Sequence, residues 1–229
     1  MSYKYHVAKA YALEGDVDSC VSSFFSVLDK EVKDNLCNSL KPSLKKNIVI
    51  SGFPRTGKSY LSKKIQEKYN IYSISLDEIR RIYWDIDDYN FRLQIRLALI
   101  TKIFTKYSSG ILIEGDDLLS VNRSANEGVE PLTTSYLIML HDLYGAKTYV
   151  IGNADCTVEN KIKGMQSYAS TANCWAVLSG EDNVKSIAKG SIDISRKLKK
   201  MFNGTGVEYI DLDPLNFKKC IGGFMETVS

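Results

Sequence analysis

The residues with the clearest chemical potential are the eight from 52 to 59, GFPRTGKS, which match the pattern GxxxxGK[ST]. In such a loop the glycines permit a tight turn, backbone N–H groups face phosphate oxygens, and the lysine reaches the β- and γ-phosphates. We predict a nucleotide site, with Lys58 also catalytic and the Ser59 hydroxyl on Mg²⁺. The predicted nucleotide-binding residues are Gly52, Phe53, Pro54, Arg55, Thr56, Gly57, Lys58, Ser59 and Tyr60.

The sequence on either side of this loop supports the prediction. The apolar run NIVIS precedes the loop and reads as a buried strand, and KSYLSKKIQEKY follows it with helical spacing. A helix that begins at the loop adds the positive end of its dipole to the anion site. The motif therefore has the strand–loop–helix context that phosphate binding requires.

Two other classes of phosphate-binding protein lack support in the sequence. A GTPase carries DxxG after a strand and NKxD late in the chain, but DLYG at 142–145 closes an expected helix and NKIK at 160–163 lacks the aspartate. A motor ATPase usually ends its acidic strand with a pair of acids, whereas here Glu114 is followed by Gly115. Both absences favour a small kinase, and the first favours ATP as the nucleotide.

A candidate pair for the phosphate acceptor follows the second expected strand, in YSISLDEIRRIYW. Asp77 and Arg80 lie three residues apart at the start of a helix, so they share one face. A carboxylate there could accept the proton of an attacking hydroxyl, and the arginine could hold an anionic group of the acceptor. The alternative is that Asp77 caps the helix and Arg80 forms a surface salt bridge.

The loop GFPRTGKS, then a strand running into SLDEIR, resembles the P-loop kinases related to polynucleotide kinases, zeta toxins and antibiotic phosphotransferases. These kinases share an adenylate-kinase-like fold. The resemblance implies that Asp77 is the general base and that Arg80 binds substrate. The segment GILIEGDDLL resembles the third strand of nucleoside and nucleotide kinases, which implies that Glu114 holds Mg²⁺ through water. Asp116 and Asp117 are second candidates, and a helix cap or turn is the alternative for each acid.

The arginine-rich lid that the family places after its fourth strand has no match here. The segment DCTVENKIKGMQSYASTANCW offers Lys161 and Lys163, for which a solvated surface position is the favoured interpretation. Arg123, in SVNRSANEG, is a further candidate for substrate binding, with a solvated surface position again the favoured interpretation. Three aromatic residues could stack an acceptor base, with core packing as the default interpretation: Tyr83, Trp84 and Trp175.

The elements that must position these residues alternate between strand and helix from residue 47 onward. Strands are expected at 47–51, 71–75, 110–115, 146–152 and 206–212, with helices between them and a last helix from Pro214. This order predicts an α/β, three-layer P-loop fold with a mainly parallel five-stranded sheet. For residues 1–46 we predict a helical extension, with two helices that break near Gly15 and a linker around Pro42. The kinase domain is predicted to span residues 47–229.

Composition sets the remaining bounds. The chain has 229 residues, a net charge of +3 and a pI near 8.4, which permits a polyanionic partner without requiring one. Five scattered cysteines without a CxxC pair suggest reduced thiols and no zinc site. The sequence has no apolar run long enough for a membrane span and no signal-peptide pattern, so we expect a cytoplasmic protein without a membrane partner.

The sequence thus predicts an ATP- and Mg²⁺-dependent kinase acting on a hydroxyl group. The acceptor is a nucleoside-like or other small molecule, or a nucleic acid, either at a polynucleotide end or at a hydroxymethylated base in DNA. The alternative is a nucleotide-binding regulatory or interaction module without transfer activity.

Overall fold

The computed structural model of the chain describes residues 3–38, 44–116, 131–169 and 180–228. Within these residues it is an α/β protein with a five-stranded sheet, all parallel, in the order β2-β3-β1-β4-β5. The strands are β1 (Ile48–Gly52), β2 (Tyr72–Ser75), β3 (Ile111–Glu114), β4 (Lys147–Gly152) and β5 (Glu208–Asp211). The predicted fold class is confirmed, and the sheet is fully rather than mainly parallel.

The described helices are α1 (Tyr3–Leu13), α2 (Val17–Asn38), α3 (Lys58–Tyr69), α4 (Leu76–Tyr83), α5 (Tyr89–Lys106), α6 (Pro131–Tyr144), α7 (Val158–Ala169), α9 (Glu181–Met201) and α10 (Phe217–Thr227). The predicted helix start at Pro214 is wrong, because Asp213 first holds a turn. Its carboxylate accepts hydrogen bonds from the Leu215 N–H at 2.9 Å and from the Asn216 side chain at 2.7 Å. Helix α10 begins only after this turn.

The chain divides into two compact units, residues 1–47 with 64–114 and residues 48–63 with 115–229. This division groups the N-terminal helices with β2, α4, α5 and β3. Nothing in the division marks residue 47 as the start of a separate kinase domain, so that boundary stays a prediction.

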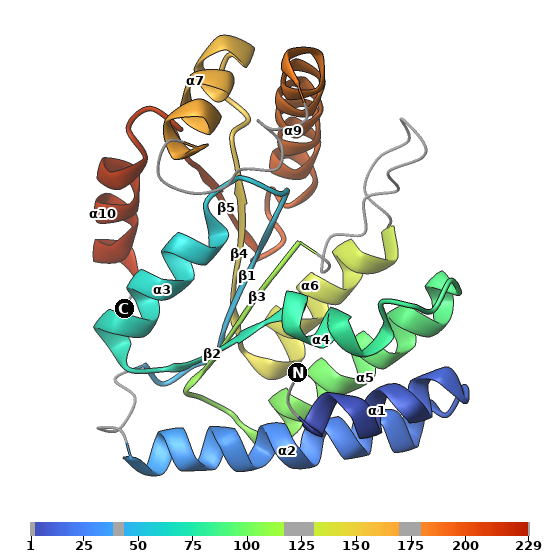
Figure 1. Cartoon of the computed structure of the whole chain (residues 1–229). Helices are drawn as coiled ribbons and strands as arrows, with labels where there is room; N and C mark the ends of the chain where they lie inside the picture. Colours follow the sequence, from blue (N-terminus) through green and yellow to red (C-terminus); the bar gives the residue numbers. More distant parts are fainter. Residues whose placement is uncertain (1–2, 39–43, 117–130, 170–179, 229) are drawn as a thin grey trace. The chain divides into compact units, whose positions relative to one another are not determined.

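In the first unit, helices α1 and α2 pack together, and α2 also contacts α5 and β2 (Figure 1). Asp29 of α2 accepts a 2.5 Å hydrogen bond from the Tyr107 hydroxyl and pairs with Lys106 at 2.7 Å and Lys33 at 2.8 Å. The ammonium donors Lys106 and Lys33, followed by the Tyr107 hydroxyl, hold the pKa of Asp29 well below its usual range. Helix α2 is therefore held within this unit by its packing on α5 and β2 and by the hydrogen bond and ion pair of Asp29 with Tyr107 and Lys106.

In the second unit, β1 and β5 each pair in parallel with β4, while α6 and α9 pack on β4 (Figure 1). The five residues of β1 are all buried, as expected for a strand in a parallel sheet whose two faces are both covered. On α10, Phe224 meets Tyr149 of β4 edge-on, with ring centroids 4.9 Å apart. Strand β1 thus delivers the loop that follows it from a rigid, fully packed position.

The cysteines that the structure describes in full are free thiols: Cys20, Cys156 and Cys220. Burial, with a smaller contribution from the negative charge of Asp16, raises the pKa of Cys20 to about 11. No helix in the described part of the chain combines the length and apolar character needed to cross a membrane.

Candidate nucleotide-binding loop and acceptor-side residues

The predicted phosphate loop occupies residues 53–57, between the end of β1 and the start of α3. Both glycines of the motif, Gly52 at the end of β1 and Gly57 in the loop, are required by space and by backbone angle. A Cβ atom on Gly52 (φ +147°) would lie 2.2 Å from the carbonyl oxygen of Ile151, and one on Gly57 (φ +97°) would lie 2.1 Å from the Phe217 ring. The strand–loop–helix context predicted for the motif is present, with glycine where other residues would clash.

Arg55 at the tip of the loop has a positive φ of +64°, in the left-handed region that L-residues rarely adopt. Such a conformation costs a non-glycine residue about 1–2 kcal/mol, so surrounding contacts must hold it. Its carbonyl oxygen accepts a 2.7 Å hydrogen bond from the Lys161 ammonium, and its guanidinium lies 5.8 Å from the centre of the Tyr168 ring. Helix α7 therefore contacts both the backbone and the side chain of Arg55.

Lys58, the lysine of the motif, is 8% exposed, and its ammonium donates a 3.1 Å hydrogen bond to the carbonyl oxygen of Phe53. The same oxygen accepts a 2.8 Å bond from the Thr56 hydroxyl. Because Pro54 has no N–H, the peptide between Phe53 and Pro54 offers only this acceptor. The bond holds the Lys58 ammonium against the loop that is predicted to receive phosphate.

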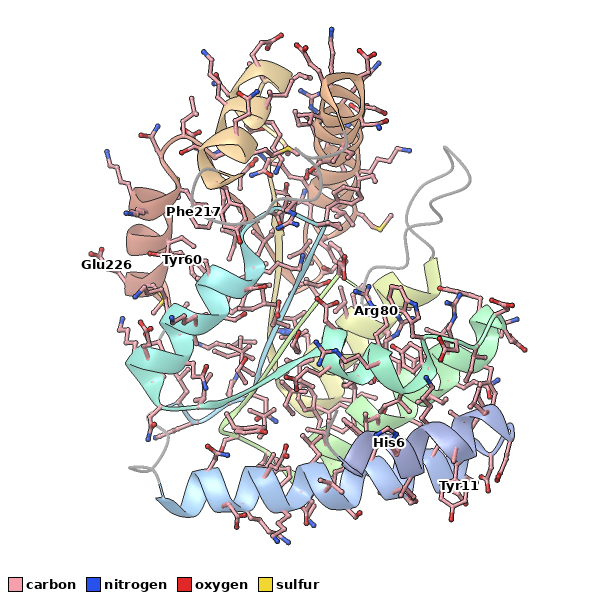
Figure 2. The ribbon with its side chains drawn as sticks, in the orientation of Figure 1. His6, Tyr11, Tyr60, Arg80, Phe217 and Glu226 are labelled. Carbon is pink, nitrogen blue, oxygen red and sulfur yellow. The ribbon has the colours of Figure 1, made fainter. Side chains whose placement is uncertain are left out.

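Helix α3 begins directly at the loop, and its first turn is open to solvent at Ser59 and Tyr60. An exposed hydroxyl at the last motif position fits a Mg²⁺ ligand, since Mg²⁺ keeps several waters and needs few protein oxygens. Figure 2 shows Tyr60 beside Phe217 of α10, and their rings meet edge-on at 5.4 Å. Phe217, whose ring lies against Gly57, is therefore also in contact with Tyr60 of α3.

Lys161 is 1% exposed, so the solvated position favoured by the sequence is wrong for this residue. Its ammonium donates to the Asn153 side-chain oxygen at 2.5 Å as well as to Arg55. Lys163, two residues along α7, is exposed as expected. No sequence signal distinguished the two lysines, because both stand in a polar helical segment.

The segment joining β4 to α7 carries titratable side chains whose pKa values are shifted by their surroundings. Burial raises the pKa of the Cys156 thiol, an effect that the positive charge of Lys161 partly opposes. Lys199 pairs with Asp155 at 2.6 Å and with Asp211 at 3.1 Å. Hydrogen bonding to Lys199 lowers the pKa of Asp155, whereas burial raises that of Asp211. These charged groups keep the segment attached to α9 and β5.

In the first unit, Asp77 and Arg80 form a salt bridge, with Arg80 Nη2 2.8 Å from Asp77 Oδ1. The N-cap of α4 is Ser75, so the capping alternative for Asp77 is wrong. Asp77 remains 62% exposed at its side chain, whereas Arg80 is 27% exposed. The structure therefore places the two predicted residues side by side on successive turns of α4. The salt bridge itself is the one that the alternative interpretation expected for Arg80, so the geometry does not decide between the two roles of this arginine.

An exposed aromatic residue extends this pair. Arg80 (labelled in Figure 2) places its guanidinium 5.1 Å from the centre of the Trp84 ring, and Trp84 is 64% exposed. Tyr83, by contrast, is 2% exposed. The core-packing default is correct for Tyr83 and wrong for Trp84, because consecutive residues of a helix face different directions.

The predicted acid Glu114 ends β3, where it is 8% exposed and in register with Ser75 of β2. The next residue, Gly115, donates from its N–H to the Ile50 carbonyl at 3.0 Å and accepts from the Ser51 hydroxyl at 3.1 Å. The chain leaving β3 thus begins beside the strand that carries the loop. Asp116 is half-buried. Asp117, Arg123 and Trp175 lie outside the described residues.

No cluster of three or more His, Cys, Asp or Glu side chains able to hold a metal ion occurs in the described ranges.

Comparisons with known proteins add no family to this description. No protein-family model matches the chain, and no curated protein matches it. The interpretation of the site therefore depends on its own residues.

Proposed function

We propose that the protein is an ATP-dependent kinase that transfers the γ-phosphate to a hydroxyl group of its acceptor. The observation that carries the proposal is the loop between β1 and α3, in which Gly52 and Gly57 have no room for a side chain and the Lys58 ammonium lies against the backbone. The same residue types at this spacing form the phosphate cradle of P-loop proteins.

On the donor side, Lys58 exchanges its bond to Phe53 for contacts with the β- and γ-phosphates. Backbone N–H groups of the loop and the N-terminal end of α3 supply further positive potential. Mg²⁺, when bound, neutralises charge on the phosphates, and Ser59 and Glu114 are the residues proposed to hold it. Lysine, amides and metal together stabilise the charge that spreads over the transferred group.

On the acceptor side, Asp77 orients the attacking hydroxyl and takes its proton. Arg80 is proposed to hold an anionic group of the acceptor, and its salt bridge with Asp77 keeps the carboxylate in one orientation before the acceptor binds. The proposal requires that the Asp77 carboxylate reach the hydroxyl within about 3 Å. The acceptor is a nucleoside-like or other small molecule, or a nucleic acid end or hydroxymethylated base.

A screen of acceptors with γ-labelled ATP tests the proposal. The acceptors are nucleosides, sugars, oligonucleotides and hydroxymethylated DNA, and transfer of label to at least one is the expected result. Raising the salt concentration then separates the classes, since nucleic-acid binding weakens steeply with salt and small-molecule binding changes much less. ATP binding without transfer to any acceptor would favour a nucleotide-binding module instead.

The variant Asp77→Asn tests the assigned base. We expect transfer to fall by about 100-fold or more, the usual contribution of a general base, with ATP affinity within about twofold of the original. Glu78→Gln is the matched control, because Glu78 is an exposed carboxylate on the same turn of α4. Equal losses in the two variants, or equal losses of transfer and of ATP affinity in Asp77→Asn, would remove Asp77 from the mechanism.

A further inference from the structure

Lys161 is a buried cation that the sequence placed on the surface and the proposed reaction does not use. It is among the largest fully buried side chains of the protein, and its ammonium donates to Arg55 in the loop and to Asn153 after β4. We propose that Lys161 is a positioning residue that fixes the direction of the Arg55–Thr56 peptide group, and through it the phosphate-binding shape of the loop. This inference depends on the proposed nucleotide site.

The geometry of the peptide bond carries the argument. A trans peptide is planar, and its carbonyl and N–H groups point in opposite directions. Because Lys161 holds the Arg55 carbonyl at 2.7 Å, the N–H of Thr56 must point away from α7. The backbone N–H groups of such a loop are the groups that bind phosphate oxygens. A flipped peptide would present a carbonyl oxygen to the phosphates in place of a donor.

The backbone at Arg55 makes this support necessary. Its positive φ of +64° is unfavourable for arginine, so the loop would relax toward other conformations without an external contact. The Lys161 bond is made only when the Arg55 carbonyl points to α7, which selects the observed conformation. Glycine at position 55 would adopt the same angle without cost.

The other end of the contact is itself anchored. Asn153 donates from its side-chain nitrogen to the Leu212 carbonyl at 2.5 Å, and its N–H donates to the Ser195 hydroxyl at 3.1 Å. Its side-chain oxygen is thus fixed toward Lys161 by contacts with α9 and the end of β5. Lys161 therefore connects the fixed side chain of Asn153 to the loop. A lysine held in this way differs from a lid residue, which must move with each turnover.

The test is MgATP affinity of the folded protein by titration calorimetry. Lys161→Met should weaken MgATP binding about tenfold. Without the lysine, its hydrogen bond no longer offsets the cost of the left-handed conformation at Arg55, so the binding-competent loop conformation becomes less populated. Lys185→Met is the matched control, because Lys185 is an exposed lysine of α9, and it should leave the affinity unchanged. Hydrogen exchange of the Thr56 amide should quicken in Lys161→Met only, a change that is measured without nucleotide.

Substitutions at position 55 distinguish an effect of Lys161 on the loop backbone from a general loss of structure in Lys161→Met. In the Lys161→Met background, Arg55→Gly should recover several-fold of the lost affinity, whereas Arg55→Ala, which keeps the unfavourable angle, should not. With Lys161 present, the glycine and alanine variants should bind MgATP equally. If Lys161→Met does not fold, Asn153→Ala, which removes the anchor of the ammonium, should weaken binding in the same direction.

Each result decides the inference. If the original protein binds no MgATP, both the proposed function and the role of Lys161 fail. If it binds MgATP but Lys161→Met binds equally well, or glycine and alanine at position 55 recover affinity equally, the positioning role fails and the nucleotide site stands.

Discussion

The contact between Gly57 and Phe217 allows a stability prediction to be worked out in detail. In Gly57→Ala the new methyl group would lie 2.1 and 2.2 Å from two carbon atoms of the Phe217 ring, and the backbone angle of +97° would be strained as well. The angle costs about 1–3 kcal/mol and the overpacking about 1–3 kcal/mol. We expect a loss of about 3 kcal/mol in the free energy of unfolding, which for a chain of this length lowers Tm by roughly 6–12 °C.

Thermal and urea unfolding of four proteins separate the two costs. They are the original chain, Gly57→Ala, Phe217→Ala and the double variant. Removing the ring leaves only the strained angle, so Gly57→Ala should cost about 1–2 kcal/mol less in the Phe217→Ala background. The control is Gly190→Ala in α9, where nothing lies within 4 Å of the new methyl group. That substitution should stabilise the protein by about 0.5–1 kcal/mol.

The outcome that refutes this reasoning is a Gly57→Ala protein as stable as Gly190→Ala. A cost that is identical with and without the Phe217 ring would refute the steric part alone, and leave the backbone angle as the whole cause.

Two further substitutions in the first unit have defined expected outcomes. Asn in place of Asp29 should lower Tm near pH 7, because the pKa of Asp29 is lowered in the folded protein by Lys106, Lys33 and Tyr107. That stabilisation is present above the ordinary carboxyl pKa of about 4 and is lost as pH falls below it. The Tm of the variant should therefore depend less on pH between about 5 and 2 than the Tm of the original protein. Parallel Tm–pH curves for the two proteins would contradict this. Trp84→Ala should change stability by less than about 0.5 kcal/mol, since the side chain is 64% exposed, yet raise the KM of an aromatic acceptor and not that of ATP. A KM unchanged for every aromatic acceptor would remove Trp84 from the site.

The sequence carried enough information to predict each strand that the described residues contain, and the spacing of the acceptor-side pair. Alternating apolar runs and helical periodicity are local signals, and they gave the order of strands and helices that the structure has. The pairing of Asp77 with Arg80 is also local, because residues three apart on a helix are neighbours. The turn before α10 was missed because the side chain of Asp213, rather than Pro214, decides where the helix begins.

The contacts that shape the loop could not be predicted in the same way. Lys161 reaches Arg55 across 106 residues of chain, and the Phe217 ring covers Gly57 from the first residue of the last helix. A lysine in a polar helical segment reads as solvated, since burial depends on which element packs over it rather than on its neighbours in sequence. The positive φ of Arg55 has no sequence signal either, because arginine has no preference for that region.

The motif is thus only part of the basis for proposing that this loop binds phosphate. The glycines can adopt the positive φ angles that the loop needs, but glycine is flexible and does not by itself select one loop conformation. Lys161 restricts the peptide that follows Arg55, and Phe217 restricts the space around Gly57, each from an element that comes later in the chain. Both contacts exist only after α7 and α10 have packed, so the local match to GxxxxGK[ST] cannot by itself establish phosphate binding. A chain with the same eight residues and neither contact would have the same motif and a less ordered loop.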